Sequence, residues 1–281
     1  MIHKEFDFYQ DNIKLYGQYW QSTITKAVLV LVHGMGEHST RYAEFVVPEF
    51  LKNDMSVITY DQFGHGKTEG KRGHNPGFAA VLDCVGIVIQ KAQRIFAGAP
   101  VFLYGHSMGG NVVINYVLKR KHNLQGVIAT SPFLRLAFQP PSWKITIGKL
   151  LQKIAPSVTM KNDLDVSAIS RDRNEVQKYI SDPLVHDKIS PNYSLTFIKT
   201  GISAIKNASK LVCPMLLLHG TGDRITSHLA TEEFTLKSNN NATIKLYKDG
   251  YHELHNDLCK KDFIFTIIQW VNFQLNKNQN I

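Results

Sequence analysis

The 281-residue chain contains no long hydrophobic run. Its longest unbroken apolar stretch is Ala27 to Val32, whereas a helix that crosses a bilayer needs about 20 such residues. The first residues, MIHKEFDFYQDN, are charged and lack the apolar segment of a secretion signal. The sequence therefore predicts a cytoplasmic protein that touches a membrane, if at all, only peripherally.

Cysteine is scarce as well. Cys84, Cys213 and Cys259 are odd in number and show no C-x-x-C spacing, which excludes a full disulfide framework and a zinc ribbon and favours a reducing compartment. The twelve histidines contain no H-E-x-x-H pattern, so we expect no metal and no cofactor.

Acidic residues are fewer than basic ones, 23 against 32, and the net charge is +9. Residues 135–210 hold twelve Lys and Arg but only six Asp and Glu, so most of the excess lies in one segment. Such a field attracts anionic partners. The lysines are scattered, and no zinc finger or base-stacking aromatic motif accompanies them, so nucleic-acid binding is not expected.

Short β-rich apolar runs recur along the chain, and segments with helical spacing lie between most of them. This alternation predicts an α/β fold with a mainly parallel sheet flanked by helices, and 5–20 reads as an antiparallel hairpin at one edge, turning at 10–12. The expected strands are 27–32, 57–60, 101–104, 126–130, 214–218 and 243–247, and the expected helices are 42–52, 78–96, 111–121 and 258–275.

The alternation stops between residues 132 and 210, where Pro-rich breaks and helix-like pieces replace the expected strand. We interpret 132–210 as an inserted, mainly helical cap on a core of 1–131 and 211–281. Its first helix, Ser142 to Ala155, is amphipathic, and its apolar face either packs inward or meets lipid. The apolar positions are Trp143, Ile147, Leu150, Leu151 and Ile154, and the lysines off this face are Lys144, Lys149 and Lys153.

The run Gly105-His106-Ser107-Met108-Gly109-Gly110 follows the strand VFLY and precedes a helical segment. This is a G-x-S-x-G motif in its required strand-to-helix context. A strained turn of this kind exposes the serine hydroxyl, and it tolerates no side chain two residues before or after. Ser107 is therefore the candidate nucleophile, and His106 beside it is expected to pack away from the site.

A serine nucleophile needs a base and an orienting carboxylate. Asp223 follows the strand PMLLL and His252 follows TIKLY, which gives the chain order Ser, Asp, His of this architecture. We predict that His252 is the base and Asp223 its orienter, the alternative being a capping aspartate and an unrelated histidine. Asp61 precedes the nucleophile and is interpreted as a loop-shaping residue, and Cys213 as a core residue.

The turn His33-Gly34-Met35-Gly36-Glu37-His38 ends the first central strand. Its glycines let the amide of Met35 join that of Met108 as the two donors to an oxyanion. A dinucleotide-binding turn would need glycine where Ser39 stands, so that alternative is disfavoured.

Together, HGMGEHSTRY, DQFGHGKTEG, GHSMGG, SDPL, HGTGDRIT and GYHELHND resemble the monoacylglycerol lipase family of α/β-hydrolases over nearly the whole chain. Many bacterial members of that family are labelled lysophospholipases. The resemblance implies the same triad and oxyanion amides. It also implies that an acyl channel runs under the cap and that four residues line a glycerol pocket: Glu37, Arg41, Tyr179 and His255.

Other interpretations stay open for these four. Glu37 and Arg41 could form a surface ion pair at i,i+4 spacing, Tyr179 could pack the cap on the body, and His255 could be solvated. The expected activity is release of a fatty acid from a monoacylglycerol-type lipid through an acyl-enzyme. The alternatives are a lysophospholipase, a short- or medium-chain carboxylesterase, a thioesterase, a peptidase, and a non-catalytic binding protein.

Overall fold

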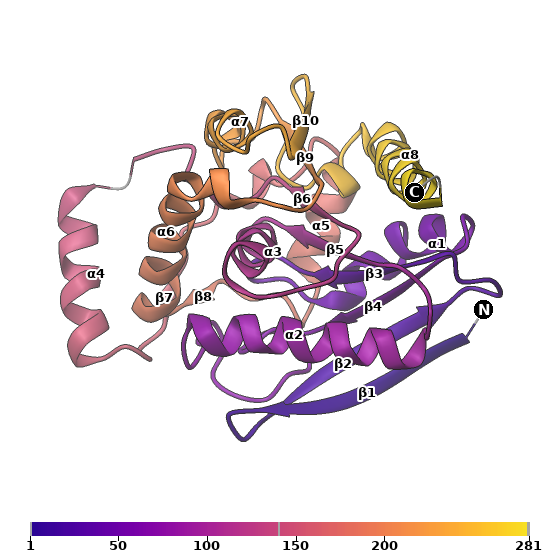
Figure 1. Ribbon diagram of the computed structural model, residues 1–281. Helices are drawn as coiled ribbons and strands as arrows, with labels where there is room; N and C mark the ends of the chain where they lie inside the picture. The colour runs from indigo at the N-terminus through magenta and orange to yellow at the C-terminus, as the bar shows by residue number, and fades with distance from the viewer. Residues whose placement is uncertain (1, 140, 280–281) are drawn as a thin grey trace.

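The computed structural model describes residues 2–139 and 141–279, without the side chains of 144, 278 and 279. Its central sheet has eight strands and confirms the predicted α/β architecture with a mainly parallel sheet (Figure 1). Six of these strands, β3, β4, β5, β6, β9 and β10, run parallel, whereas β2 is antiparallel to both β1 and β4. In spatial order the strands are β1 (Ile2–Gln10), β2 (Ile13–Gln21), β4 (Met55–Tyr60), β3 (Ala27–Val32), β5 (Val101–His106), β6 (Gly126–Thr130), β9 (Met215–Gly220) and β10 (Ala242–Tyr247).

The predicted edge hairpin is confirmed. Gln10 pairs with Ile13 across a two-residue turn, and Asp11 and Asn12 have φ values of 51° and 60°. Asp and Asn tolerate this left-handed region better than other non-glycine residues, which suits them to such a turn. The hairpin extends the sheet because β2 pairs with β4.

The sheet is buried on both faces, and β3 shows why. Its alternate residues Val28, Val30 and Val32 pack with α2 (Phe78–Ile95) and α3 (Met108–Lys119), whereas Ala27, Leu29 and Leu31 pack with α1 (Val46–Leu51) and α8 (Lys260–Gln279). A strand covered on both sides has no polar alternation, as the sequence AVLVLV indicated.

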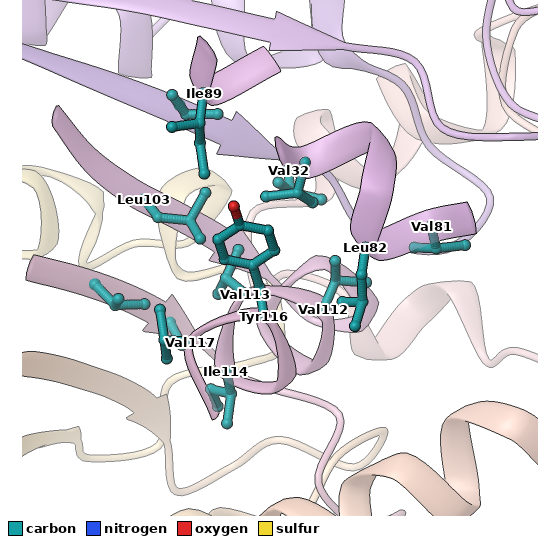
Figure 2. Close-up of a cluster of buried hydrophobic side chains, with 14 of the residues drawn as sticks. Val32, Val81, Leu82, Ile89, Leu103, Val112, Val113, Ile114, Tyr116 and Val117 are labelled. Carbon is teal, nitrogen blue, oxygen red and sulfur yellow. The ribbon is translucent and has the colours of Figure 1, made fainter. Parts of the chain in front are cut away.

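The first of these layers anchors α3, the helix that follows Ser107. In Figure 2, Tyr116 of α3 lies among Leu103 of β5, Ile89 of α2 and Val113 of its own helix. Close packing of this kind resists displacement of α3, so the turn before the helix is held on a rigid element.

The expected helix at 42–52 is interrupted. The chain forms a 3-10 turn, η1 (Ser39–Ala43), and the helix α1 then begins at Val46. Pro48 explains the break, because it has no N–H to donate to the carbonyl of residue 44 and is tolerated only in the first turn of a helix.

The segment 132–210 is mainly helical, as predicted. It contains α4 (Ser142–Ile154), α5 (Arg173–Ser181), α6 (Pro191–Lys206), the turns η2 (Val166–Ala168) and η3 (Ala208–Lys210), and a ribbon of β7 (Met160–Lys161) and β8 (Lys188–Ile189). α6 contacts both α3 and α7 (His228–Leu236), and α4 lies on its outer side (Figure 1). The division into a core and a cap at 132–210 stays a proposal. Within 132–210, α6 is the helix that packs against α3 and α7 of the proposed core.

The apolar face of α4 points outward. Trp143, Ile147, Leu150 and Ile154 are 61%, 49%, 57% and 69% exposed, while Leu151 is half-buried. The interpretation in which this face packs inward is therefore wrong. The inner side of α4 includes Ile145 and Gly148, which border a cavity. Lys149 and Lys153 are exposed, and the side chain of Lys144 lies outside the described part.

Within the described ranges, no helix combines the length and the hydropathy that a bilayer-crossing segment requires.

Candidate active site

Ser107 stands at the turn between β5 and α3 with φ 54° and ψ −114°. A Cβ at Gly105 would collide with the carbonyl oxygen of Gly109, and a Cβ at Gly109 with that of Val32. The Ser107 N–H donates to the carbonyl of Thr130 at 2.9 Å, which helps to hold the strained backbone. The main chain at Gly105, at Gly109 and at Val32 therefore passes too close for a side chain, which explains the glycine spacing of the motif.

The structure brings Ser107, His252 and Asp223 into one hydrogen-bonded chain. His252 Nε2 lies 2.8 Å from Ser107 Oγ, and His252 Nδ1 lies 2.7 Å from Asp223 Oδ2. All three side chains are buried. They follow β5, β9 and β10, whose carboxyl ends meet at one edge of the sheet.

Asp223 is held by more donors than His252 alone. Its Oδ1 accepts from the amides of Ile225 and Thr226 at 2.8 and 3.0 Å, and its Oδ2 also accepts from Thr226 Oγ1 at 2.8 Å and His219 Nε2 at 3.0 Å. Burial alone would favour the neutral acid, but His252, His219 and these bonds outweigh it and hold the pKa of Asp223 well below its usual range. The carboxylate is therefore ionised at neutral pH.

An ionised Asp223 accepts the Nδ1 proton of His252, so Nε2 is left as the acceptor that faces Ser107. Burial opposes a charged imidazole, yet the neighbouring carboxylate outweighs it and raises the pKa of His252. The arrangement can move the hydroxyl proton to the ring and stabilise the imidazolium that results. Sequence reasoning missed His219 and Thr226, although both flank Asp223 in HGTGDRIT.

Met35 and Met108 line the same cavity as Ser107. Met108 is the first residue of α3, and the Met35 turn lies against the nucleophile, because a Cβ at Gly34 would be 3.3 Å from that of Ser107. Glu37 Oε1 accepts the N–H of Gly34 at 2.6 Å. The loop expected to supply one oxyanion amide is thus fixed by a buried carboxylate.

Glu37 and Arg41 do form an ion pair, at 2.8 Å, but it is buried, with side chains 2% and 7% exposed. The interpretation as a surface pair is therefore wrong. Arg41 also binds Glu253 through two bonds of 2.7 and 2.8 Å. Burial and the nearby Glu253 raise the pKa of Glu37, while Arg41 overcomes burial to lower that of Glu253. Sequence reasoning missed Glu253, although its position directly after His252 could have marked it as a residue of the site.

Tyr179 lines the cavity, and its ring lies 4.7 Å from the guanidinium of Arg41. His255 is buried rather than solvated, stacked on Tyr42 at 4.8 Å and 4.8 Å from His106. Burial lowers the pKa of His255 to about 3, so the ring is neutral. Arg41 and His255 are not among the described residues that line the cavity, and both lie behind its wall.

The cavity has a volume of about 400 Å³, within the range of small-molecule sites. Ser107, Glu37, Tyr179 and Glu253 contribute to its polar part. Its remaining wall is largely apolar and comes mostly from α4, α6 and neighbouring loops, including Phe133, Leu136, Ile145, Leu195, Phe197 and Ile225.

Other residues singled out in the sequence have structural positions. Asp61 accepts the amides of Ser39 and Lys67 at 2.8 Å each and so shapes its loop. His106 Nδ1 lies 3.0 Å from Thr130 Oγ1 in the interior, and Cys213 is buried. Over the described residues, no group of three or more His, Cys, Asp or Glu has the arrangement of a metal site.

Comparisons with known proteins show the family of the chain. A family model described as serine aminopeptidase, S33, matches residues 23–259. The monoglyceride lipase of Homo sapiens is 33% identical over 253 residues, which are 88% of this chain and 82% of that protein. An uncharacterized abhydrolase domain-containing protein of Dictyostelium discoideum is 35% identical over 257 residues, 90% of this chain but only 27% of that longer protein.

Among solved structures, the monoacylglycerol lipase of Paleococcus ferrophilus superposes with a TM-score of 0.85 at 33% identity, covering 92% of this chain and 99% of that one. The chain belongs to the serine aminopeptidase S33 family of α/β-hydrolases, as a serine hydrolase of the lipase and esterase group that acts on ester bonds.

Proposed function

We propose that this protein hydrolyses the ester of a single-chain lipid, with a monoacylglycerol as its substrate, through Ser107, His252 and Asp223. The observation that carries the proposal is the continuous chain from Ser107 Oγ through His252 to Asp223, with bonds of 2.8 and 2.7 Å. Ser107 and His252 of this hydrogen-bonded triad line a largely apolar cavity. The cavity suits one acyl chain, and its polar part suits a small head group.

In the proposed reaction, Ser107 attacks the ester carbonyl while His252 takes the hydroxyl proton. The amides of Met35 and Met108 bind the oxyanion. His252 then protonates the leaving glycerol oxygen, and the acyl group stays on Ser107. A water molecule activated by His252 releases the fatty acid and restores the serine. No metal or cofactor takes part in these steps.

The glycerol contacts are divided between two pairs of residues. Glu37 and Tyr179 border the cavity, so they would meet the head group directly. Arg41 and His255 lie behind them and would act by holding the wall in place. The cap, 132–210, would cover the acyl chain.

A lipid panel tests the substrate. Purified wild type and Ser107→Ala are compared on 1-oleoylglycerol, lysophosphatidylcholine, p-nitrophenyl butyrate and an aminoacyl amide. We expect hydrolysis by wild type only, with the highest kcat/KM on 1-oleoylglycerol. Faster cleavage of lysophosphatidylcholine would indicate a lysophospholipase instead, and cleavage of p-nitrophenyl butyrate alone would indicate a carboxylesterase. Faster cleavage of the aminoacyl amide would indicate a peptidase. No turnover of any of them would favour the binding-protein alternative.

The outward face of α4 supports a peripheral contact with membranes. Trp143, Ile147, Leu150 and Ile154 are exposed on a helix that also carries Lys149 and Lys153, a pattern typical of helices that lie in a lipid interface. Vesicles containing phosphatidylserine should bind wild type better than Ile147→Ser/Leu150→Ser in a flotation assay. Equal flotation would contradict this contact.

A further inference from the structure

Beside the polar part of the cavity, two buried carboxylates share one buried guanidinium. The Arg41 guanidinium lies between two carboxylates, with Nη1 at 2.8 Å from Glu37 Oε2 and at 2.7 Å from Glu253 Oε1. Nη2 binds Glu253 Oε2 at 2.8 Å. When both acids are ionised, this cluster carries one net negative charge in a site shielded from solvent.

The two carboxylates, and not the guanidinium, border the space that substrate occupies. Glu37 and Glu253 line the cavity, whereas Arg41 is not among its described lining residues. Bidentate pairing with Glu253 uses the edge with two N–H donors that an arginine would otherwise present to a phosphate. Glu253 therefore removes from this pocket the cation that a phospholipid head group would need.

We propose that Glu253 is a specificity-determining residue, which makes the head-group pocket accept a neutral polyol and reject a phosphate. This inference rests on the proposed function, because it assigns the leaving group of the same reaction. It separates glycerol esters from lysophospholipids, which share an acyl chain and differ only in the group that this pocket receives.

Hydrogen-bond capacity agrees with a polyol. A carboxylate has about four acceptor sites. Glu37 uses three, for Gly34, Tyr42 and Arg41, and Glu253 uses three, two for Arg41 and one for Asn256. About one acceptor site remains on each carboxylate, and a monoacylglycerol has two hydroxyls to donate. A phosphate brings a charge of about −1.5 to −2 and no comparable set of donors.

Among the described residues, one lysine and no arginine line the cavity. Lys161 belongs to the ribbon strand β7, its side chain is 76% exposed, and it lies 3.8 Å from Asp187. Asp163 lines the cavity beside it. A solvated lysine with acidic neighbours contributes little to binding, so Lys161 does not reverse the balance set by Glu253.

The test compares kcat/KM for 1-oleoylglycerol, 1-oleoylglycerol 3-phosphate and p-nitrophenyl butyrate, the last as an ester without a head group. Wild type should prefer the neutral glycerol ester. In Glu253→Gln, the ratio of phosphate ester to glycerol ester should rise about tenfold, since one buried like charge is removed and Arg41 is partly released. Glu233→Gln, which removes an equal charge on the surface of α7, should keep the wild-type ratio.

A wild-type preference for the phosphate ester, or an unchanged ratio in Glu253→Gln, would overturn the inference while leaving ester hydrolysis intact. Absence of hydrolysis of all three esters by wild type would instead overturn the proposed function. If Glu253→Gln does not fold, as judged by its circular dichroism, the same ratio is measured in Glu253→Met, which keeps a similar volume without a charge.

Discussion

Replacing Asp223 with Asn tests how the carboxylate controls His252. The side chain keeps its size, but one oxygen becomes an NH2 donor. In wild type Oδ1 accepts two backbone amides and Oδ2 accepts His252 Nδ1, with bonds of 2.7 to 3.0 Å. The asparagine oxygen should stay with the backbone amides, which cannot turn away, so the NH2 group should face His252.

The consequence is the wrong tautomer. An NH2 group donates to Nδ1, so the proton moves to Nε2, and the ring then points a donor at Ser107, 2.8 Å away. A donor cannot accept the serine proton. In a serine hydrolase of another fold this exchange lowers kcat about 10⁴-fold, and we expect a loss of about the same size here. His219 Nε2 and Thr226 Oγ1 would also each lose one of their acceptors, at a cost of about 1–3 kcal/mol in the free energy of unfolding.

The assay is kcat/KM for p-nitrophenyl butyrate, with thermal unfolding measured in parallel to separate activity from stability. Asp223→Glu serves as the matched control, because it keeps an acceptor for Nδ1 and should retain more activity than Asp223→Asn. A folded Asp223→Asn protein with less than a tenfold loss would refute this role for Asp223.

Three further predictions follow from the site. Activity needs neutral His252, whose pKa is raised from its ordinary value of 6.5, so kcat/KM should fall as the pH drops through a midpoint above 6.5; a pH profile with its acidic midpoint below 6.5 would contradict this. His219→Leu removes one donor to Asp223 and should lower kcat/KM about tenfold, with partial recovery in His219→Gln; equal activity in both variants would exclude a positioning role. Gly109→Ala drives a Cβ into the Val32 carbonyl and should cost about 1–3 kcal/mol of stability with loss of activity, whereas Gly148→Ala, whose Cβ would lie 3.6 Å from Leu195, should unfold at nearly the wild-type temperature.

Much of the fold was predictable because its signals are local. A strand buried on both faces, such as β3, has a continuous apolar sequence, and the glycines at 105 and 109 report a backbone crossing that no other residue allows. The positions of Asp223 and His252 after successive strands were predictable because parallel strands bring their carboxyl ends to one edge. In each case a few neighbouring residues determine the structure.

The missed features depend on contacts between distant segments. Arg41 meets Glu253 across 212 positions, and no pattern around either residue indicates the pair. The outward orientation of α4 depends on how it docks on α6, since an amphipathic helix shows only that its faces differ. Pro48 was visible in the sequence, and proline is tolerated only in the first turn of a helix. The helical spacing of apolar residues on both sides of it nevertheless led to the prediction of one continuous helix.

The central claim is that His252 activates Ser107, and covalent labelling measures this most directly. Wild type, Ser107→Ala and His252→Ala are incubated with a fluorophosphonate, and the adduct is located by peptide mass spectrometry. We predict a single adduct on Ser107 in wild type, none on Ser107→Ala, and labelling slowed at least 10³-fold in His252→Ala. An adduct at another residue, or equal labelling rates in wild type and His252→Ala, would contradict the account.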